Sequence, residues 1–416
     1  MDAHLSHKYL CEELSPAPSD MNILYLCHRI PYPPDKGDKI RSYHQIKFLS
    51  QHHSVFLACL IDDPHDWQYV EPLRSMCQVV GVVDRKGLKE WLRIGKAFLS
   101  GHPLSLGTFF VPALQEKVNL ILAQESIDRI VIFSSPMAEY VKQVSSIPKI
   151  IDFVDMDSEK WRAYARIKPF PLSVLYRTEA DRLGQYEFEM ATTCQESLVI
   201  SQEEAQVLRE RSNQMVVPKV IPNGVDDEYF SPPSEVRKTR PIIVFTAAMD
   251  YFPNIDGALF FCQEILPRIH HMIPQAQFLI VGRNPVSALR RIAERMPQVQ
   301  VTGTVPDVRP YLSEAMVAVA PLRIARGVQN KILEAMAMEL PVVGTTSAFQ
   351  GLAVASEHGM YVADDPGEFA DAVVKLLGSP ECARAYGVSA REFVTSHHDW
   401  SIILQEFEQI LEGVTV

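Results

Sequence analysis

The stretch GVQNKILEAMAMELPVVGTT (residues 327–346) contains an apolar, helix-like run directly followed by a short strand-like run. A glycine opens the first run, and apolar residues occupy almost every side of it, so we expect a buried helix that begins at Gly327. The run PVVGTT then has the length and composition of a buried strand. Short apolar strands that alternate with helices are typical of a parallel, doubly wound sheet.

The same alternation continues along most of the chain. Strand-like runs in the first half lie at 22–27, 54–61, 79–83, 129–135, 149–155, 197–202 and 219–226. A polar, proline-rich segment at 228–241 contains no strand and is typical of a linker. After it, strand-like runs lie at 241–249, 276–282, 299–305, 317–323, 341–346 and 359–365.

We therefore predict an α/β protein with two Rossmann-like, doubly wound domains. Residues 1–20 form a loose extension, 21–230 the N-terminal domain and 231–395 the C-terminal domain, and an amphipathic segment within 396–416 could pack back on the N-terminal domain or on the other one. Two such domains are expected to face a cleft at the carboxyl ends of their strands, where ligands of this architecture bind.

Composition restricts the class of protein. The 416-residue chain is 47% hydrophobic and 22% charged, which is an ordinary globular composition. The net charge of −11 argues against general nucleic-acid binding. Seven cysteines without a C-x-x-C pair indicate buried, reduced thiols and a cytosolic protein rather than disulfides or zinc. No apolar run approaches the roughly 18 residues of a membrane span, and residues 1–20 lack the order of a signal peptide.

The apolar helix carries two charges, Lys331 and Glu334, three residues apart. They could form a simple helical ion pair, but the order of Lys before Glu opposes the helix dipole. Arg323 and Arg326 add positive charge near the helix start, where the dipole is already positive. We therefore predict that Arg323, Arg326, Gly327 and Lys331 bind a phosphate or diphosphate, and that Glu334 accepts hydrogen bonds from hydroxyls of the same ligand. A sugar nucleotide supplies both a diphosphate and a ribose.

Several motifs together resemble a known family. PNGVDDEYFSP, FLIVGRNP, VTGTVPDVRPYL and KILEAMAMELPVV occur in the order and spacing of glycosyltransferase family 4, and the resemblance covers most of the chain from Asn22 onward. HRIPYPPDKGDKIRSYH, VDMDSEKW, FTAAMDYFPNIDG and RIARGVQNKILEAMA more closely resemble the exosortase (PEP-CTERM)-associated sugar transferases of bacterial exopolysaccharide clusters. The resemblance implies the GT-B architecture, a nucleotide-sugar held mainly by the C-terminal domain, and retaining transfer without a bound metal or other cofactor.

The chain departs from the family pattern in two places. The family usually has two glutamates eight positions apart; the second matches Glu334, which implies ribose binding, whereas the first would fall at Arg326. An Arg and a Lys usually follow the first strand of the second domain, and AAMDYFPN (247–254) contains neither. We expect Arg323, Arg326 and Lys331 to supply the missing positive charge.

Asp155 and Asp157 form an Asp-x-Asp pair just after a predicted strand. Such a pair holds Mn²⁺ in metal-dependent glycosyltransferases of a different fold, but the basic helix start already offers a diphosphate site, so we predict no metal here. Asp155 could instead accept a proton from an acceptor hydroxyl or orient the acceptor. Asp157 or Ser158 could cap the helix that follows.

The first strand-to-helix loop, PPDKGDK (33–39), lacks the G-x-G-x-x-G fingerprint, which argues against NAD binding. Gly37 would allow a ligand to approach the backbone, and Asp38 could cap the helix. The resemblance places this loop near the transferred sugar and the diphosphate. Lys39 and Arg41 are therefore candidates for ligand contact, with a solvated helix face as the alternative.

Ser134 and Ser135 end another strand, at a place where many family members have a histidine. Five histidines show no metal-ligand spacing, and we expect most of them at the surface: His28, His44, His52, His53 and His102.

The segment 85–106 combines basic and apolar side chains: Lys86, Lys89, Arg93 and Lys96 with Trp91, Leu92, Phe98 and Leu99. A basic amphipathic helix can lie on an anionic membrane, and an ordinary packed helix with a solvated basic face is the alternative. The sequence thus predicts a cytoplasmic protein that could contact the inner membrane peripherally.

These features predict a hexosyltransferase that moves a sugar from a nucleoside diphosphate-sugar to a glycan or lipid-linked acceptor in exopolysaccharide synthesis, without a nucleic-acid partner. Two alternatives remain open: a nucleotide-sugar epimerase of the same architecture, and a non-catalytic nucleotide- or glycan-binding protein.

Overall fold

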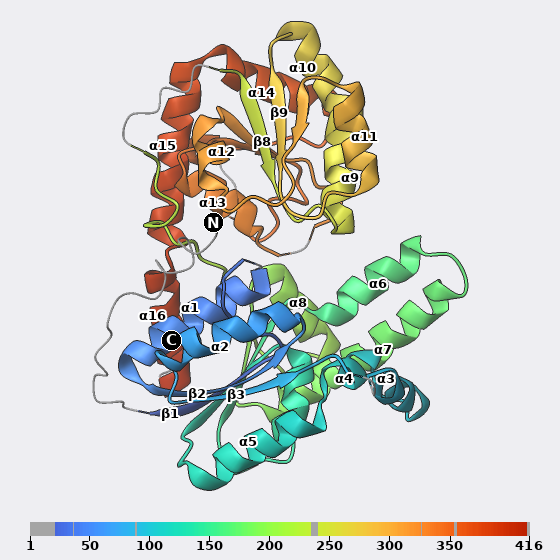
Figure 1. Ribbon diagram of the computed structural model, residues 1–416, viewed down its shortest axis with the longest axis vertical. Coiled ribbons are helices and arrows are strands. Elements are labelled where there is room, and N and C mark those ends of the chain that lie inside the picture. The colour runs from blue at the N-terminus through green and yellow to red at the C-terminus, as the bar shows by residue number, and fades with distance from the viewer. Residues whose placement is uncertain are drawn as a thin grey trace. The chain divides into compact units, whose positions relative to one another are not determined.

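The computed structural model describes residues 21–35, 37–87, 90–233, 240–325, 327–352 and 356–413. The predicted extension at 1–20, as well as Arg326 and Lys89, lies outside the described residues. The chain forms two compact units: an N-terminal unit of Met1–Ile221 with Leu404–Val416, and a C-terminal unit of Pro222–Ile403 (Figure 1). None of the helices in the described ranges is both long and apolar enough to cross a membrane.

The N-terminal unit is built on a parallel sheet of seven strands within the described residues, in the order β3-β2-β1-β4-β5-β6-β7. The strands are β1 (Asn22–Cys27), β2 (Ser54–Ile61), β3 (Val79–Asp84), β4 (Arg129–Phe133), β5 (Lys149–Val154), β6 (Glu196–Val199) and β7 (Lys219–Val220). The helices are α1 (Gly37–His52), α2 (Val70–Arg74), α3 (Glu90–Leu99), α4 (Leu104–Phe109), α5 (Pro112–Gln124), α6 (Asp157–Ile167), α7 (Leu172–Thr193) and α8 (Gln202–Arg211). Figure 1 shows α1 and α2 on one face of this sheet and α5 on the other.

The C-terminal unit repeats this topology with six parallel strands in its described part, in the order β10-β9-β8-β11-β12-β13. The strands are β8 (Ile242–Thr246), β9 (Gln277–Val281), β10 (Val299–Val301), β11 (Val317–Ala320), β12 (Val342–Gly344) and β13 (Met360–Val362). The helices are α9 (Phe252–Phe260), α10 (Leu266–Met272), α11 (Ser287–Arg295), α12 (Arg309–Glu314), α13 (Asn330–Ala337), α14 (Pro366–Gly378), α15 (Pro380–His397) and α16 (Trp400–Glu412), the last of which continues into the N-terminal unit.

Both sheets confirm the predicted α/β class and the position of nearly every predicted strand. The strand interiors are almost continuously apolar, as expected for parallel strands covered on both faces, and their side chains form the core of each unit. The run predicted at 219–226 differs, because only Lys219–Val220 pairs with a neighbouring strand.

The two units divide at Ile221–Pro222, before the linker that the sequence indicated. Side chains of the C-terminal unit hold this segment in place. The Arg391 guanidinium donates to the carbonyls of Phe230 and Asp227, and the Arg309 guanidinium lies 3.8 Å from the centroid of the Tyr229 ring. Residues 222–230 are therefore anchored to the C-terminal unit rather than to the N-terminal one.

The chain re-enters the N-terminal unit at Leu404, within α16. The Glu408 carboxylate lies 2.9 Å from Nδ1 of His52 and 3.3 Å from Nε2 of His53, and Arg129 donates to the Leu411 carbonyl. The end of α16 thus packs on the N-terminal unit.

Candidate functional site

In each sheet the strand order reverses next to the first strand of the unit, between β8 and β11 and between β1 and β4. Parallel sheets bind ligands at the carboxyl ends of the strands beside such a reversal, because the flanking connections diverge there. Each unit therefore has one expected binding region.

In the C-terminal unit, α13 follows the carboxyl end of β11. The helix begins at Asn330, later than the predicted start at Gly327. Gly327 has a φ of 62°, a left-handed conformation that a right-handed helix cannot include, and the Gln329 side chain donates to its carbonyl at 3.1 Å. The backbone N–H groups of the first helical turn are thus presented from Asn330 onward.

Lys331 and Glu334 lie on the first and second turns of α13. The Lys331 ammonium donates to Oδ1 of Asn254 at 2.6 Å and lies 5.3 Å from the centroid of the Phe245 ring. Burial lowers the pKa of Lys331 to about 8, although the charge of Glu334 opposes this shift. Burial likewise raises the pKa of Glu334 to about 7, against the effect of Lys331. Each group therefore carries a charge that the unliganded protein stabilises poorly.

Arg323 is engaged within the protein. Its Nε and Nη2 atoms form a fork to the Asp256 carboxylate at 2.9 and 2.5 Å, and its guanidinium lies 4.9 Å from the centroid of the Phe260 ring. The hydrogen bond that Arg323 donates to Asp256 raises the pKa of Arg323. From the sequence we expected the positive charge of Arg323 to bind a diphosphate. In the structure this guanidinium pairs with the Asp256 carboxylate, which neutralises its charge.

Helix α9 supplies the partners of both cations. Asn254 also donates to the Ala248 carbonyl at 2.9 Å, which fixes its amide so that Oδ1 accepts from Lys331. One turn of α9 approaches the end of β11 closely, because a Cβ at Gly257 would lie 2.9 Å from the Pro321 carbonyl oxygen. The glycine lets α9 bring Asn254 and Asp256 against the β11–α13 connection.

In the N-terminal unit, His28 follows the carboxyl end of β1. Its Nδ1 atom lies 3.0 Å from the Ser134 hydroxyl, just after β4, and its Nε2 atom lies 3.1 Å from the Asp38 carboxylate on α1. Arg29 also donates to Asp38, at 2.6 Å. Burial alone would raise the pKa of Asp38, but His28 and Arg29 hold it well below its usual range. The structure therefore links a carboxylate, an imidazole and a hydroxyl in series.

The expected helix cap at Asp38 is replaced by this network, and Gly37 is the first residue of α1 and is exposed. Ser135, which follows Ser134, is buried. Ser134 and Val154, at the ends of the neighbouring strands β4 and β5, have φ values of 72° and 65°. Such backbone angles are unfavourable for a β-branched residue and concentrate near functional sites.

Lys39 and Arg41 are buried inside the unit rather than on a solvated face. Nζ of Lys39 lies 2.8 Å from Asp66, and Nε of Arg41 lies 2.7 Å from Asp152, with both members of the second pair fully buried. Gln45 also donates to Asp152. The alternative of a solvated helix face is therefore wrong, because buried carboxylates hold both cations and tie α1 to the sheet and to the chain after β2. Ligand contact by Lys39 and Arg41 stays a prediction.

Asp155 follows β5 and is partly buried, and Asp157 is the first residue of α6. The expected capping by Asp157 or Ser158 is wrong, since Met156 occupies the N-cap position without a side-chain bond. Two other helices satisfy the helix start instead. Glu187 accepts from the Ser158 backbone and hydroxyl at 3.2 and 2.5 Å, and Glu204 accepts from the Met156 backbone.

The pKa of Glu187 rises to about 8 because the carboxyl group is buried. The helix start that follows Asp155 is thus a closed internal contact. Among the described residues, no group of three or more His, Cys, Asp or Glu side chains could hold a metal ion.

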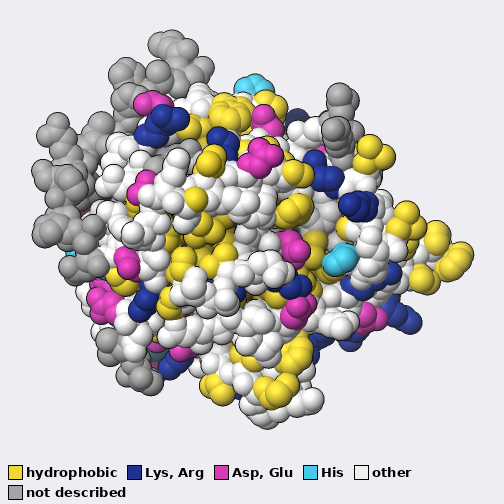
Figure 2. All heavy atoms as spheres, turned by 90° about the horizontal axis from the view of Figure 1, so that it is seen from below, with side chains coloured by type: hydrophobic (Ala, Val, Ile, Leu, Met, Phe, Trp, Pro, Cys, Tyr) yellow, Lys and Arg dark blue, Asp and Glu magenta, His cyan; other side chains and the backbone are white. Residues whose placement is uncertain are grey.

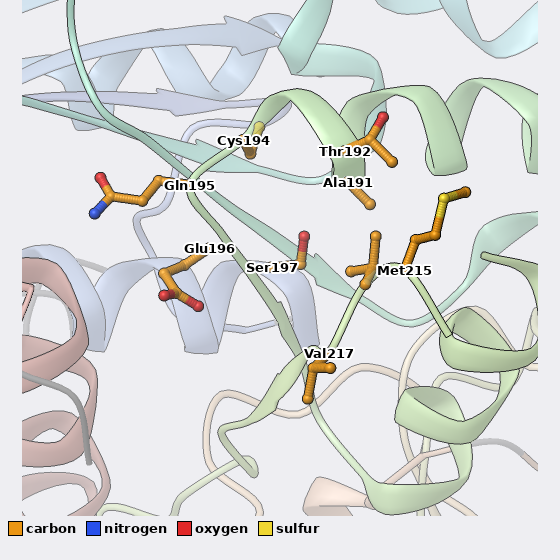
Figure 3. Close-up of a pocket in the computed structure, with 9 residues that line it drawn as sticks. Ala191, Thr192, Cys194, Gln195, Glu196, Ser197, Met215 and Val217 are labelled. Atoms are coloured by element: carbon orange, nitrogen blue, oxygen red, sulfur yellow. The ribbon is translucent and has the colours of Figure 1, made fainter. Parts of the chain in front are cut away.

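A surface hollow of about 230 Å³ lies elsewhere in the N-terminal unit (Figure 3). Its lining comes from the end of α7, the start of β6 and the segment before β7: Ala191, Thr192, Cys194, Gln195, Glu196, Ser197, Met215, Val216 and Val217. It therefore lies at the amino end of β6, away from the carboxyl edge, and none of the predicted site residues lines it.

Several residues of the two regions were missed by the sequence analysis. His28 is one of five histidines of which most were expected at the surface, yet its ring is only partly exposed, and two others of the five, His44 and His53, are buried. The signal available for His28 was its place directly after the first strand. Asn254 had a similar signal, since it lies in the first turn of the first helix after β8.

Comparisons with known proteins agree with this architecture. Residues 240–379, within the C-terminal unit, match the family model described as Glycosyl transferases group 1. A phosphatidyl-myo-inositol mannosyltransferase of Mycobacterium tuberculosis is 26% identical over 206 residues, which are 47% of this chain and 53% of the relative. The chain thus spans about half the length of the curated relatives that it matches.

Solved structures match over almost the whole chain. Sucrose-phosphate synthase from Thermosynechococcus elongatus has a TM-score of 0.73 at 18% identity and covers 95% of this chain and 99% of its own. Anabaena HepE in complex with UDP and glucose has a TM-score of 0.65 at 13% identity and covers 94% and 100%. The glycosyltransferase WaaG, involved in lipopolysaccharide biosynthesis, has a TM-score of 0.64 at 15% identity and covers 94% and 100%. These likenesses confirm the predicted GT-B fold, and the match at 240–379 supports a glycosyltransferase.

Proposed function

We propose that this protein is a retaining, metal-independent hexosyltransferase of the family 4 type. It moves a sugar from a nucleoside diphosphate-sugar to a glycan or lipid-linked acceptor in bacterial exopolysaccharide synthesis, as the exosortase-associated transferases that it resembles are expected to do. The observation that carries the proposal is the start of α13, where Lys331 and Glu334, both partly buried, lie on one helix inside the region that matches the glycosyltransferase model.

The donor is expected to lie against this helix start. A diphosphate would receive hydrogen bonds from the first-turn N–H groups and from Lys331, whose charge the free protein stabilises poorly. A ribose hydroxyl would donate to Glu334 and favour its ionised form. The similar structure of Anabaena HepE contains UDP-glucose, so a UDP-sugar is the first donor to test.

Transfer breaks the bond between the sugar and the diphosphate and forms a bond between the same carbon and the acceptor oxygen. Negative charge develops on the departing diphosphate, so the helix start and Lys331 would stabilise the transition state more than the ground state. Ser134, His28 and Asp38 form the best supported acceptor-side group, because their hydrogen bonds could receive and pass on the proton of the acceptor hydroxyl. Asp155 stays a candidate for orienting the acceptor.

The proposal is tested with a panel of UDP-, GDP- and ADP-sugars. We expect one donor to raise the melting temperature and then, with a lipid or glycan acceptor, to release its nucleoside diphosphate. A donor that changes its sugar without an acceptor would indicate an epimerase, and a donor that binds but is never consumed would indicate a binding protein.

A further inference from the structure

We infer that α3 and the turn between α6 and α7 together form a surface that docks on an anionic lipid bilayer. The inference extends the membrane contact that the sequence predicted for 85–106 by adding a second element, and it names the surface that would bring the proposed transferase to a lipid-linked acceptor. It rests on the N-terminal unit alone and does not require that the donor site be correct.

Helix α3 presents its large apolar side chains to solvent. No residue of this ten-residue helix is buried, and the exposed fractions are 81% for Trp91, 72% for Leu92 and 87% for Leu99. Two of its polar residues contact the rest of the unit instead: Arg93 donates to the Arg85 carbonyl at 2.9 Å, and Glu90 pairs with Arg85. An amphipathic helix in water normally has the opposite orientation.

The turn between α6 and α7 is a second apolar projection that the sequence analysis did not identify. All residues from Arg166 to Leu172 are exposed. The exposed fractions are 51% for Ile167, 82% for Phe170 and 55% for Val174. Scattered single apolar residues on a surface need no explanation, but neighbouring ones of this size mark an interaction surface.

Helix α7 ties the two elements together. Its Arg182 donates to the Phe98 carbonyl at 2.9 Å and lies 5.0 Å from the centroid of the Phe98 ring, at the end of α3. Its buried Glu179 accepts from the backbone of Leu104 and Ser105, at the start of α4.

Helix α3 in turn lies tightly on α4, because a Cβ at Gly107 would come within 2.7 Å of Ile94 Cα. These contacts fix α3 against α4 and against α7, the helix that the turn leads into. Figure 2, which views the molecule from below, shows hydrophobic side chains projecting at the right-hand edge with Lys and Arg side chains close to them, on the side where Figure 1 labels α3 and α6.

The charged residues around these apolar side chains indicate which partner docks on them. The segment 160–178 contains only cationic charged residues, namely Lys160, Arg162, Arg166, Lys168 and Arg177, although the whole chain has a net charge of −11. On α3, the exposed Lys96 lies among the apolar side chains. Exposed apolar groups rimmed by cations fit the boundary between acyl chains and anionic headgroups. A symmetric dimer through this surface is disfavoured, since it would oppose like charges.

The test is flotation of the full chain with phosphatidylcholine vesicles prepared with and without phosphatidylglycerol. We expect binding to the anionic vesicles, and at least about tenfold weaker binding for Phe170→Glu and for Leu99→Glu, since each places a charge where an apolar side chain enters the interface. Leu120→Glu is the matched control, because Leu120 is 56% exposed but lies on α5. It should bind like the parent.

Three results would overturn the inference. The first is no flotation with anionic vesicles, and the second is flotation of the Phe170→Glu and Leu99→Glu variants equal to that of the parent. The third is a parent that is a dimer in light scattering and becomes a monomer with Phe170→Glu. Donor binding in lipid-free solution is measured in parallel. Its retention by all variants shows that they fold, and its absence in the parent would count against the donor site without affecting the flotation result.

Discussion

Replacing Lys331 with Met tests the donor site while keeping most of the side chain's volume. The change removes one charge-assisted hydrogen bond to a diphosphate, an interaction worth about 1.5–3 kcal/mol. At about 1.4 kcal/mol per factor of ten, donor affinity should fall roughly 10- to 150-fold. Donor affinity rather than melting temperature is the readout, because the substitution removes a charge that burial disfavours but also takes the hydrogen bond from Asn254 Oδ1 and the opposing charge from Glu334.

The pH dependence of binding follows from the same lysine. With a pKa of about 8 in the free protein, Lys331 is mostly protonated at neutral pH and mostly neutral about one unit above that value. Binding of a diphosphate must then take up a proton, so affinity should fall by up to about tenfold per pH unit above pH 8. The Met variant should lack this fall.

Isothermal titration calorimetry with the donor identified in the panel measures both effects. Lys375→Met is the matched control, because Lys375 also lies beside an aromatic ring in the C-terminal unit, 5.7 Å from the centroid of Tyr361, but on α14. Unchanged donor affinity in the Lys331 variant, or an equal loss in the Lys375 variant, would refute the role assigned to Lys331.

Further predictions concern the other groups. Glu334→Gln should raise the melting temperature of the unliganded protein at pH 8 much more than at pH 5. The pKa of Glu334 is raised from 4.5 to about 7, so the folded state loses stability between these two pH values and carries the full penalty at pH 8. The variant should also weaken nucleoside binding about tenfold, and scanning fluorimetry and calorimetry measure the two effects. Ser134→Ala should lower turnover and leave donor affinity unchanged in steady-state kinetics; a loss confined to donor affinity would remove it from the acceptor side. Arg41→Met should destabilise the fold by about 3–5 kcal/mol in urea unfolding, since it leaves Asp152 buried without that partner, and a loss below about 1 kcal/mol would show that the pair is dispensable.

The fold was predictable because each buried parallel strand forms a short apolar run bounded by polar loops, and this pattern is local. The helix start at Asn330 was not predictable to the residue, because a glycine can precede a helix as well as open it. Nor was the domain boundary, which depends on where Arg309 and Arg391 attach the connecting segment.

Of the candidate site, only the charged residues Lys331 and Glu334 could be predicted from the sequence. Sequence position indicated that Lys331 and Glu334 lie near a helix start, but the partners Asn254, Asp256 and Asp152 come from distant segments, and only the structure shows which cation each of them holds. The sequence alone does not distinguish Lys331 from Arg323 and Arg41. The distant partner of each cation does, because Arg323 and Arg41 pair with carboxylates whereas Lys331 bonds to an amide oxygen.

The central claim is that the sugar of a bound nucleotide donor is transferred to an acceptor. Nuclear magnetic resonance of the donor's anomeric signal, followed in time with acceptor present, tests it most directly. The account predicts that the donor signal declines in step with a new glycosidic signal of the same anomeric configuration and with release of the nucleoside diphosphate. A donor signal that is unchanged, or that converts to another nucleotide-sugar without an acceptor, would contradict it.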